Sequence, residues 1–188
     1  MLLTVTGLIV FIALHSFRGH MASSRDRLIA KLGLFGFRIL FSMLTIASLL
    51  AIGLGLSGAR QNPVVIWQPD PLWRPAMSYA MYFVALGFTA RWVPATYLRY
   101  WLKQPVLLAI VLWSLLHFAV GGLLHQMIVY FIILLWAILA LWRDRHEVVG
   151  APVSFYRDVI AIVLAGVLWY GFAVYLHAAI IGVSVIIF

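Results

Sequence analysis

Residues 104–122 read QPVLLAIVLWSLLHFAVGG, an apolar run that carries one histidine, His117. A run of about 20 apolar residues is long enough to cross a bilayer as a helix. An imidazole inside lipid is costly unless a partner, a metal or a proton pathway uses it, so His117 is a functional candidate. Trp113 and Ser114 precede it by four and three residues, and Gly121 follows it by four. The spacing predicts one helix face with an aromatic wall, a hydroxyl, an imidazole and a gap.

The composition of the whole chain is that of an integral membrane protein. The 188 residues are 65% hydrophobic and only 10% charged, whereas soluble domains average about 45–50% apolar and about 25% charged. Lipid cannot satisfy free backbone groups, so a spanning segment is a helix or part of a closed barrel. The apolar runs are solid, without the alternation of barrel strands. We therefore expect an all-α polytopic bundle.

Six apolar runs predict a six-transmembrane-helix bundle in a single domain over residues 1–188. The runs cover about 2–17, 33–57, 76–93, 104–122, 126–142 and 158–185. Pro105 suits the first turn of the fourth span, and the Pro/Trp-rich residues 62–75 interrupt the chain between the second and third. The first 17 residues lack a basic leading region and a small-residue cleavage pattern, so they are interpreted as a retained helix.

Basic residues predict the orientation. Ten of the 13 Lys and Arg residues follow the first, third or fifth span: Arg18, Arg25, Arg27, Lys31, Arg91, Arg99, Lys103, Arg143, Arg145 and Arg157. Only Arg60 and Arg74 lie in the opposite loops. The positive-inside rule then places both termini on the non-cytoplasmic side. The net charge of +8 indicates contact with membrane lipids, and no nucleic-acid partner is expected.

The side chains restrict the chemistry. The chain has six histidines, no cysteine and five acidic residues, all of which lie in or next to loops. This pattern excludes disulfides, iron–sulfur ligation and thiol catalysis, and it disfavours catalysis by paired carboxylates. Imidazoles from two helices commonly hold a haem iron inside a bundle. His15, His117 and His177 lie within predicted spans and are the candidates.

Each candidate has a structural alternative. A transmembrane histidine such as His117 can simply hydrogen-bond to a neighbouring helix, and His15 and His177 can be interfacial residues. Arg18 and Arg38 can snorkel to lipid phosphate or clamp an anionic group such as haem propionates. The remaining histidines are predicted to lie at the surface: His20, His125 and His146. Tryptophans near span ends, such as Trp67 and Trp73, are predicted to be interfacial anchors.

Three segments resemble the NnrU family. They are His15-Ser16-Phe17-Arg18, the run from Gly36-Phe37-Arg38 to Ser42, and residues 104–122, which match elements written HSxR, G[YF]RxxxS and HPxLxxxLxWxxxHxxxNG. Their order and spacing extend the resemblance over essentially the whole chain. Gln104 stands where the family often has histidine, and Gly121 where it often has asparagine.

The resemblance implies a function. NnrU proteins are bacterial membrane proteins associated with nitrite and nitric oxide reduction. The family is similar to plant 15-cis-zeta-carotene isomerase, which uses haem b with histidine ligands. Carried over by position, the iron ligands would be His15 and His117, with Arg18, Arg38, Trp113 and Gly121 around the cofactor.

The implied protein is a multi-pass haem protein of the bacterial inner membrane that acts on a lipid-soluble polyene or isoprenoid as a redox-dependent cis-trans isomerase. A non-catalytic haem or nitric oxide sensor, or an accessory protein of denitrification, is the alternative, and a membrane methyltransferase is a third. His117 lies about twelve residues, or ~18 Å of helix, from the cytoplasmic start of its span. His15 is expected nearer the cytoplasmic face, so His177 is an alternative second ligand.

Overall fold

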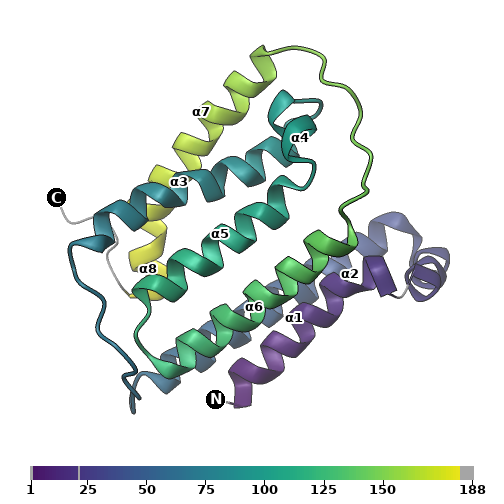
Figure 1. Cartoon of the computed structure of the whole chain (residues 1–188). Coiled ribbons are helices and arrows are strands. Elements are labelled where there is room, and N and C mark those ends of the chain that lie inside the picture. The colour runs from purple at the N-terminus through teal and green to yellow at the C-terminus, as the bar shows by residue number, and fades with distance from the viewer. Residues whose placement is uncertain (1, 21, 183–188) are drawn as a thin grey trace. The chain divides into compact units, whose positions relative to one another are not determined.

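The fold was taken from a computed structural model, which describes residues 2–20 and 22–182 without the side chains of residues 17–20, 22, 180 and 181. The described chain is helical and contains no strand, only an isolated bridge between Val65 and Leu123. Figure 1 shows the helices in chain order. The chain divides into two compact units, Met1–Val64 and Val65–Phe188. The all-α prediction is confirmed.

The first unit is a pair of helices, α1 (Leu2–His20) and α2 (Ala22–Ala59). The backbone of α2 leaves the helical conformation at Gly33, with φ 71° and ψ 164°. Positive φ is accessible to glycine because it has no Cβ. The long apolar part of α2 therefore restarts where the sequence predicts the second span to begin.

Small residues let α1 and α2 pack closely. A Cβ added at Gly55 would lie 2.2 Å from Oγ1 of Thr4, and one added at Gly7 would lie 2.7 Å from the carbonyl oxygen of Ser48. Gly53 has no neighbour within 4 Å of such a Cβ. In lipid, helices associate through close packing of this kind, because apolar burial alone offers no advantage over lipid tails.

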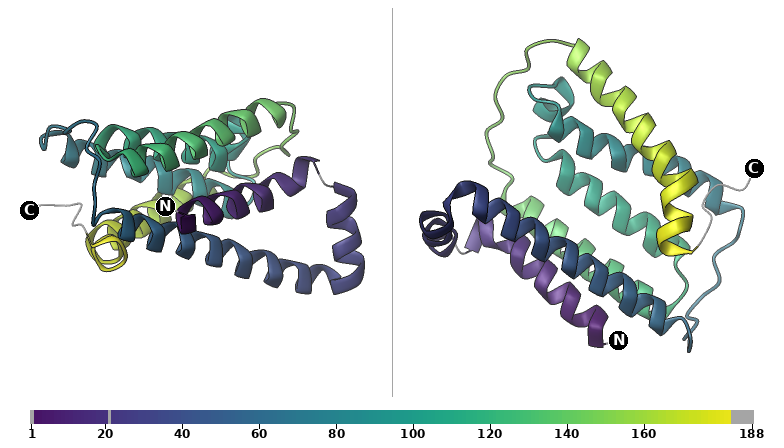
Figure 2. Two further views of the ribbon diagram at one scale, coloured as in Figure 1. Left: turned by 90° about the horizontal axis from the view of Figure 1, so that it is seen from below. Right: turned by 180° about the vertical axis from the view of Figure 1, so that it is seen from behind.

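The second unit contains four long helices: α3 (Trp73–Trp92), α5 (Pro105–Val120), α6 (Leu124–Arg143) and α7 (Tyr156–Gly171). α3, α5 and α6 follow one another side by side, and α7 crosses α3, behind it in Figure 1 and in front of it in the view from behind in Figure 2. Pro105 is the first residue of α5, as predicted. Only three residues join α5 to α6, so these two helices form an antiparallel hairpin.

A short helix, α4 (Tyr97–Leu102), was not predicted. Asp158, in the first turn of α7 and only 2% exposed, accepts hydrogen bonds from the backbone N–H groups of Tyr97 (3.0 Å) and Leu98 (2.8 Å). Thr96 caps the same helix by accepting from the Arg99 N–H at 3.1 Å. The carboxylate thus satisfies donors that a helix start leaves unpaired.

Three side chains join α3 and α7 through backbone carbonyls. The Thr89 hydroxyl donates to Ala161 (2.8 Å), the Tyr82 hydroxyl to Ile162 (3.2 Å), and the indole N–H of Trp169 to Ser78 (2.7 Å). Ala161 and Ala165 are fully buried. Small residues and interhelical hydrogen bonds are the usual means of helix association in lipid.

The end of α7 departs from a regular helix. Residues Phe172–Leu176 form a π-helical turn (η1). α8 (His177–Ile181) follows, and Gly182, whose φ is 76°, is its C-terminal cap. A left-handed glycine commonly terminates a helix. The sixth run was predicted to reach residue 185; the helix ends at Ile181, and residues 183–185 lie outside the described part.

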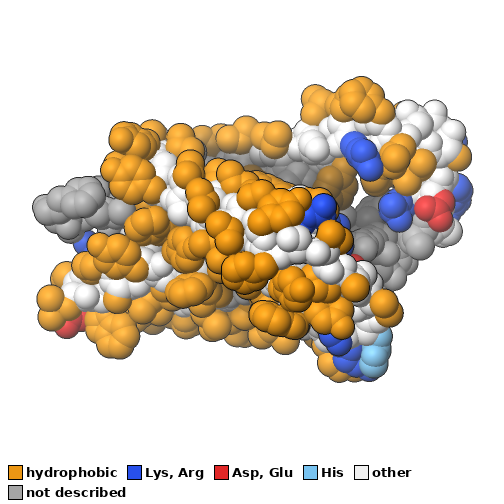
Figure 3. Space-filling view, turned by 90° about the horizontal axis from the view of Figure 1, so that it is seen from above, with side chains coloured by type: hydrophobic (Ala, Val, Ile, Leu, Met, Phe, Trp, Pro, Cys, Tyr) orange, Lys and Arg blue, Asp and Glu red, His pale blue; other side chains and the backbone are white. Residues whose placement is uncertain are grey.

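Three described helices are long and apolar enough to cross a membrane, at Ser23–Ala59, Leu124–Arg143 and Tyr156–Ala179. Leu2–Ser16 and Pro105–Val120 are apolar but shorter. Large apolar side chains are exposed along these helices, as at Leu139 (56%), Val163 (58%) and Val167 (64%), and hydrophobic side chains cover much of the face drawn in Figure 3. Such a surface suits lipid. The count of six spans stays a prediction.

Candidate functional site

His117 lies in the last turn of α5, three residues before the helix ends at Val120. Twelve residues separate it from Pro105, the first residue of the helix, as the sequence indicates. The ring nitrogen Nδ1 donates a hydrogen bond to the carbonyl oxygen of Trp113 at 2.9 Å. A neutral imidazole that donates from Nδ1 keeps a lone pair on Nε2. Nε2 is the nitrogen that can bind a metal, and the bond at Nδ1 fixes the tautomer and the ring orientation.

Two aromatic rings surround this imidazole. The Trp113 ring centroid is 4.5 Å from that of His117, and Tyr130 of α6 lies 5.1 Å from His117 and 5.4 Å from Trp113. The predicted wall at Trp113 is confirmed. Tyr130 was missed, although the tight turn before α6 indicates that the first two turns of that helix face the end of α5.

The Ser114 hydroxyl is fully buried and has no hydrogen-bond partner among the described residues. An unpaired buried hydroxyl is unfavourable in an apolar interior.

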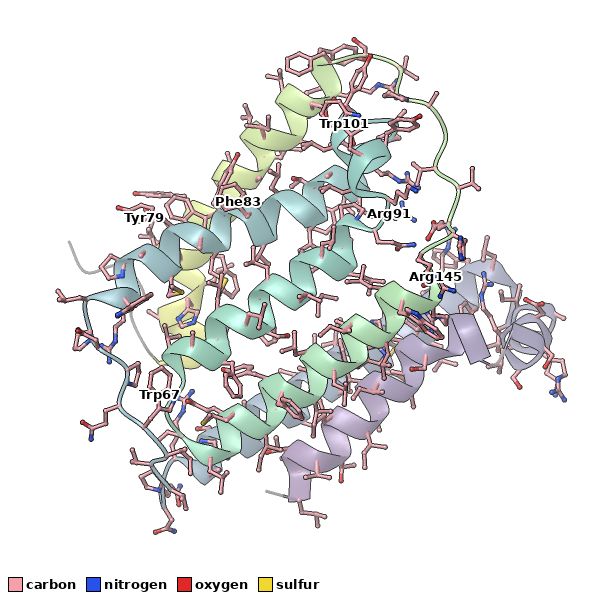
Figure 4. The ribbon with its side chains drawn as sticks, in the orientation of Figure 1. Trp67, Tyr79, Phe83, Arg91, Trp101 and Arg145 are labelled. Carbon is pink, nitrogen blue, oxygen red and sulfur yellow. The ribbon has the colours of Figure 1, made fainter. Side chains whose placement is uncertain are left out.

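The turn after α5 is closely packed against a segment from the loop before α3, residues 65–67, which we call the strap. The N–H groups of Ile66 (2.8 Å) and Trp67 (3.3 Å) donate to the Gly122 carbonyl oxygen. The indole N–H of Trp67 donates to the Gly121 carbonyl oxygen at 3.0 Å. Trp67 was predicted to be an interfacial anchor. Its indole N–H bonds to this turn while the side chain stays exposed, and the anchor role stays a prediction. Figure 4 shows Trp67 at one end of the second unit, with Arg91 and Trp101 at the other.

Both glycines of the turn permit close approach. A Cβ at Gly121 would lie 2.8 Å from the His117 carbonyl oxygen and 3.4 Å from Cε2 of Tyr130. A Cβ at Gly122 would lie 1.9 Å from the carbonyl oxygen of Trp67. Gly121 was predicted to leave a gap beside His117; backbone and the Tyr130 ring occupy that space.

His177, the first residue of α8, belongs to the same unit as His117. The π-helical turn at Phe172–Leu176 immediately precedes His177, and the ring of Phe172 lies 5.9 Å from it. Single π-helical turns occur frequently at functional sites. The alternative partner for His117 is thus in its own unit.

His15 belongs to the first unit and repeats the local pattern of His117. Its Nδ1 donates to the carbonyl oxygen of Phe11, four residues earlier, at 2.8 Å. The Phe11 ring stacks on it at 4.2 Å, and Phe41 of α2 lies at 5.3 Å. Each of these two histidines is therefore held by its own helix backbone and flanked by one aromatic ring from each of two helices. Their pairing on one iron stays a prediction.

The remaining predicted residues lie as follows. Arg38 is exposed on α2. Arg18 lies in α1, and its side chain is outside the described part of the chain. Their role as a clamp stays a prediction. His146 is exposed, as predicted, but His125 is only 5% exposed, so its assignment to the surface was wrong.

Gln104 lies at the end of α5 opposite His117. Its amide donates to the Asp144 carbonyl oxygen at 3.2 Å and to a carboxylate oxygen of Glu147. These contacts join the start of α5 to the loop after α6. No group of three or more His, Asp or Glu side chains that would hold a bare metal ion occurs in the described ranges.

The sequence profile of the family described as NnrU protein matches residues 3–185, nearly the whole chain. The chain belongs to the NnrU family. The resemblance seen in the three sequence elements is thereby confirmed, and the matched range includes both units and every NnrU element named above. No curated protein and no solved structure gave a match.

Proposed function

We propose that this NnrU protein is an integral membrane protein of the bacterial inner membrane that binds haem b through His117. The observation that carries the proposal is the hydrogen bond from Nδ1 of His117 to the Trp113 carbonyl. It leaves Nε2 on the side of the ring away from the helix backbone, where an iron would bind.

The surroundings of His117 fit a planar apolar cofactor. Trp113 and Tyr130 supply aromatic surface beside the imidazole. A second imidazole would come from His15, which has the same local geometry, or from His177. Arg18 and Arg38 are the candidate cations for the propionates.

We further propose that the reaction is cis-trans isomerisation of a lipid-soluble polyene or isoprenoid. The haem iron, when bound, supplies a Lewis acid or one-electron centre. The chain's own residues orient the imidazole, present aromatic walls to an extended apolar molecule and exclude water. An isomerisation adds no atom and requires no general base.

The test is an optical spectrum of protein purified after haem-supplemented expression. We expect a Soret band in the wild type, its loss or strong reduction in His117→Ala, and its retention in His146→Ala, the exposed control. If His15→Ala or His177→Ala changes the spin state of the haem iron, the residue replaced in that variant is the second iron ligand. A wild type without a Soret band, or His117→Ala with an unchanged band, would contradict the haem assignment.

A separate assay tests the reaction. Reduced protein is incubated with cis-polyenes, and the isomers are separated by chromatography. We expect trans product from the wild type and none from His117→Ala. A haem-loaded protein that forms no product contradicts the isomerase and favours the sensor or accessory role in nitrite and nitric oxide reduction.

A further inference from the structure

α5 is too short to reach both surfaces of a bilayer. Its 16 residues span about 24 Å, against a hydrocarbon core of about 30 Å. If Pro105 starts at a membrane surface, as the polar contacts of Gln104 indicate, the other end stops inside the apolar layer. The carbonyls of Gly121 and Gly122 then have no water to bond with, which is costly in hydrocarbon.

The strap supplies the missing donors. Three N–H groups, from the backbone of Ile66 and Trp67 and from the Trp67 indole, reach the carbonyl oxygens of Gly121 and Gly122. Both glycines are buried. The fit at Gly122 excludes any side chain, because a Cβ would lie 1.9 Å from the Trp67 carbonyl oxygen. The strap and the recessed turn are therefore closely packed against each other.

This turn is directly connected to His117. The Gly121 N–H donates to the His117 carbonyl oxygen at 2.8 Å, and the Gly121 carbonyl accepts from Trp67. The Gly121 backbone also lies against Tyr130, the ring that packs on the His117 imidazole. A shift of the strap would be transmitted through Gly121 to the His117 backbone and to the Tyr130 ring, which packs on the imidazole.

We propose that Trp67 is a positioning residue for His117: the strap closes the recessed end of α5 and sets the orientation of the His117 ring. The inference that this orientation matters for a ligand rests on the proposed haem function. The packing itself does not, and it is testable in the protein without haem.

The first measurement is hydrogen exchange of a peptide covering residues 114–122, read by mass spectrometry on the apo protein in detergent. Trp67→Phe removes the indole donor and keeps an aromatic ring. We expect exchange on the order of tenfold faster in this peptide, given the size of hydrogen bonds between membrane segments, and no change in α7. Trp73→Phe, at the exposed tryptophan that begins α3, is the matched control.

A cross-link distinguishes positioning from any other role of the indole. Val65 and Leu123 form an isolated antiparallel pair flanked by the Ile66–Gly122 hydrogen bond. In an antiparallel pair whose two residues do not hydrogen-bond to each other, the Cα atoms are about 4.5 Å apart. A disulfide can span that distance. The chain has no native cysteine, so Val65→Cys with Leu123→Cys gives one defined disulfide.

In the Trp67→Phe background, the oxidised cross-link should restore slow exchange, and reduction should abolish the rescue. In haem-loaded protein, Trp67→Phe should keep the Soret band but shift the electron paramagnetic resonance g values, and the cross-link should shift them back. Unchanged exchange in Trp67→Phe, failure of the disulfide to form, or absence of rescue would overturn the proposal. If the wild type binds no haem, the proposed function fails while the exchange data still decide the role of the strap.

Discussion

At the scale of single residues, local spacing predicted only contacts within one helix. Trp113 lies on the His117 ring because both residues belong to α5 at a separation of four. Tyr130 and Trp67 reach the same region from α6 and from the loop before α3. Their contributions depend on which helices are neighbours, and no spacing along the chain encodes that.

Gly122 gives a prediction at this scale. Gly122→Ala should lower the free energy of unfolding by about 1–3 kcal/mol, because the new methyl group overpacks against the Trp67 carbonyl. The measurement is a denaturant titration in mixed micelles. Gly53→Ala is the control: it has open space and a helix propensity gain of up to about 1 kcal/mol, so stability should be equal or higher. A Gly122→Ala protein as stable as the wild type would show that the strap is not packed on this turn.

At the scale of elements, apolar runs predicted the long helices well, and polar interruptions predicted their ends. α5 begins at Pro105 and α2 restarts after Gly33, both as expected. The short α4 and the π-helical turn were not predicted. α4 is held by Asp158, sixty residues away, so its stability comes from a contact outside its own sequence.

Asp158 gives a prediction at the scale of elements. Asp158→Ala should lower the free energy of unfolding by about 1–3 kcal/mol, since two backbone donors of α4 lose a charged acceptor. Asp158→Asn should lose less, because one amide oxygen remains. The measurement is the same titration, together with hydrogen exchange over residues 97–102. Asp26→Ala, at an exposed position, should stay within about 0.5 kcal/mol of the wild type. Equal stability of all three variants would contradict the capping role.

At the scale of the whole molecule, the distribution of charge predicts how the chain is inserted. In the second unit, Arg91 and Arg145 lie at the end opposite Trp67 (Figure 4). The loops after the third and fifth spans therefore share one end of this unit, and their cytoplasmic location stays a prediction. Basic residues are retained on the cytoplasmic side during insertion, so an orientation can be argued without knowledge of the packing.

The absence of cysteine allows a direct test of this topology. Gln61→Cys and His146→Cys each introduce one thiol at an exposed position. We expect a membrane-impermeant maleimide to label Gln61→Cys in intact spheroplasts and His146→Cys only after permeabilisation. The cysteine-free parent is the labelling control. The reverse pattern would overturn the predicted orientation of both termini.

The sequence by itself determined the helical class, most helix limits and the NnrU family, because hydropathy, proline and glycine positions and motif spacing are local properties of the chain. Only the tertiary structure decided which side chains surround His117, that Trp67 closes the end of α5, and that His125 and Asp158 are buried. These features arise where helices distant in sequence pack together. Packing depends on the shapes of both surfaces, and neither surface alone specifies its partner.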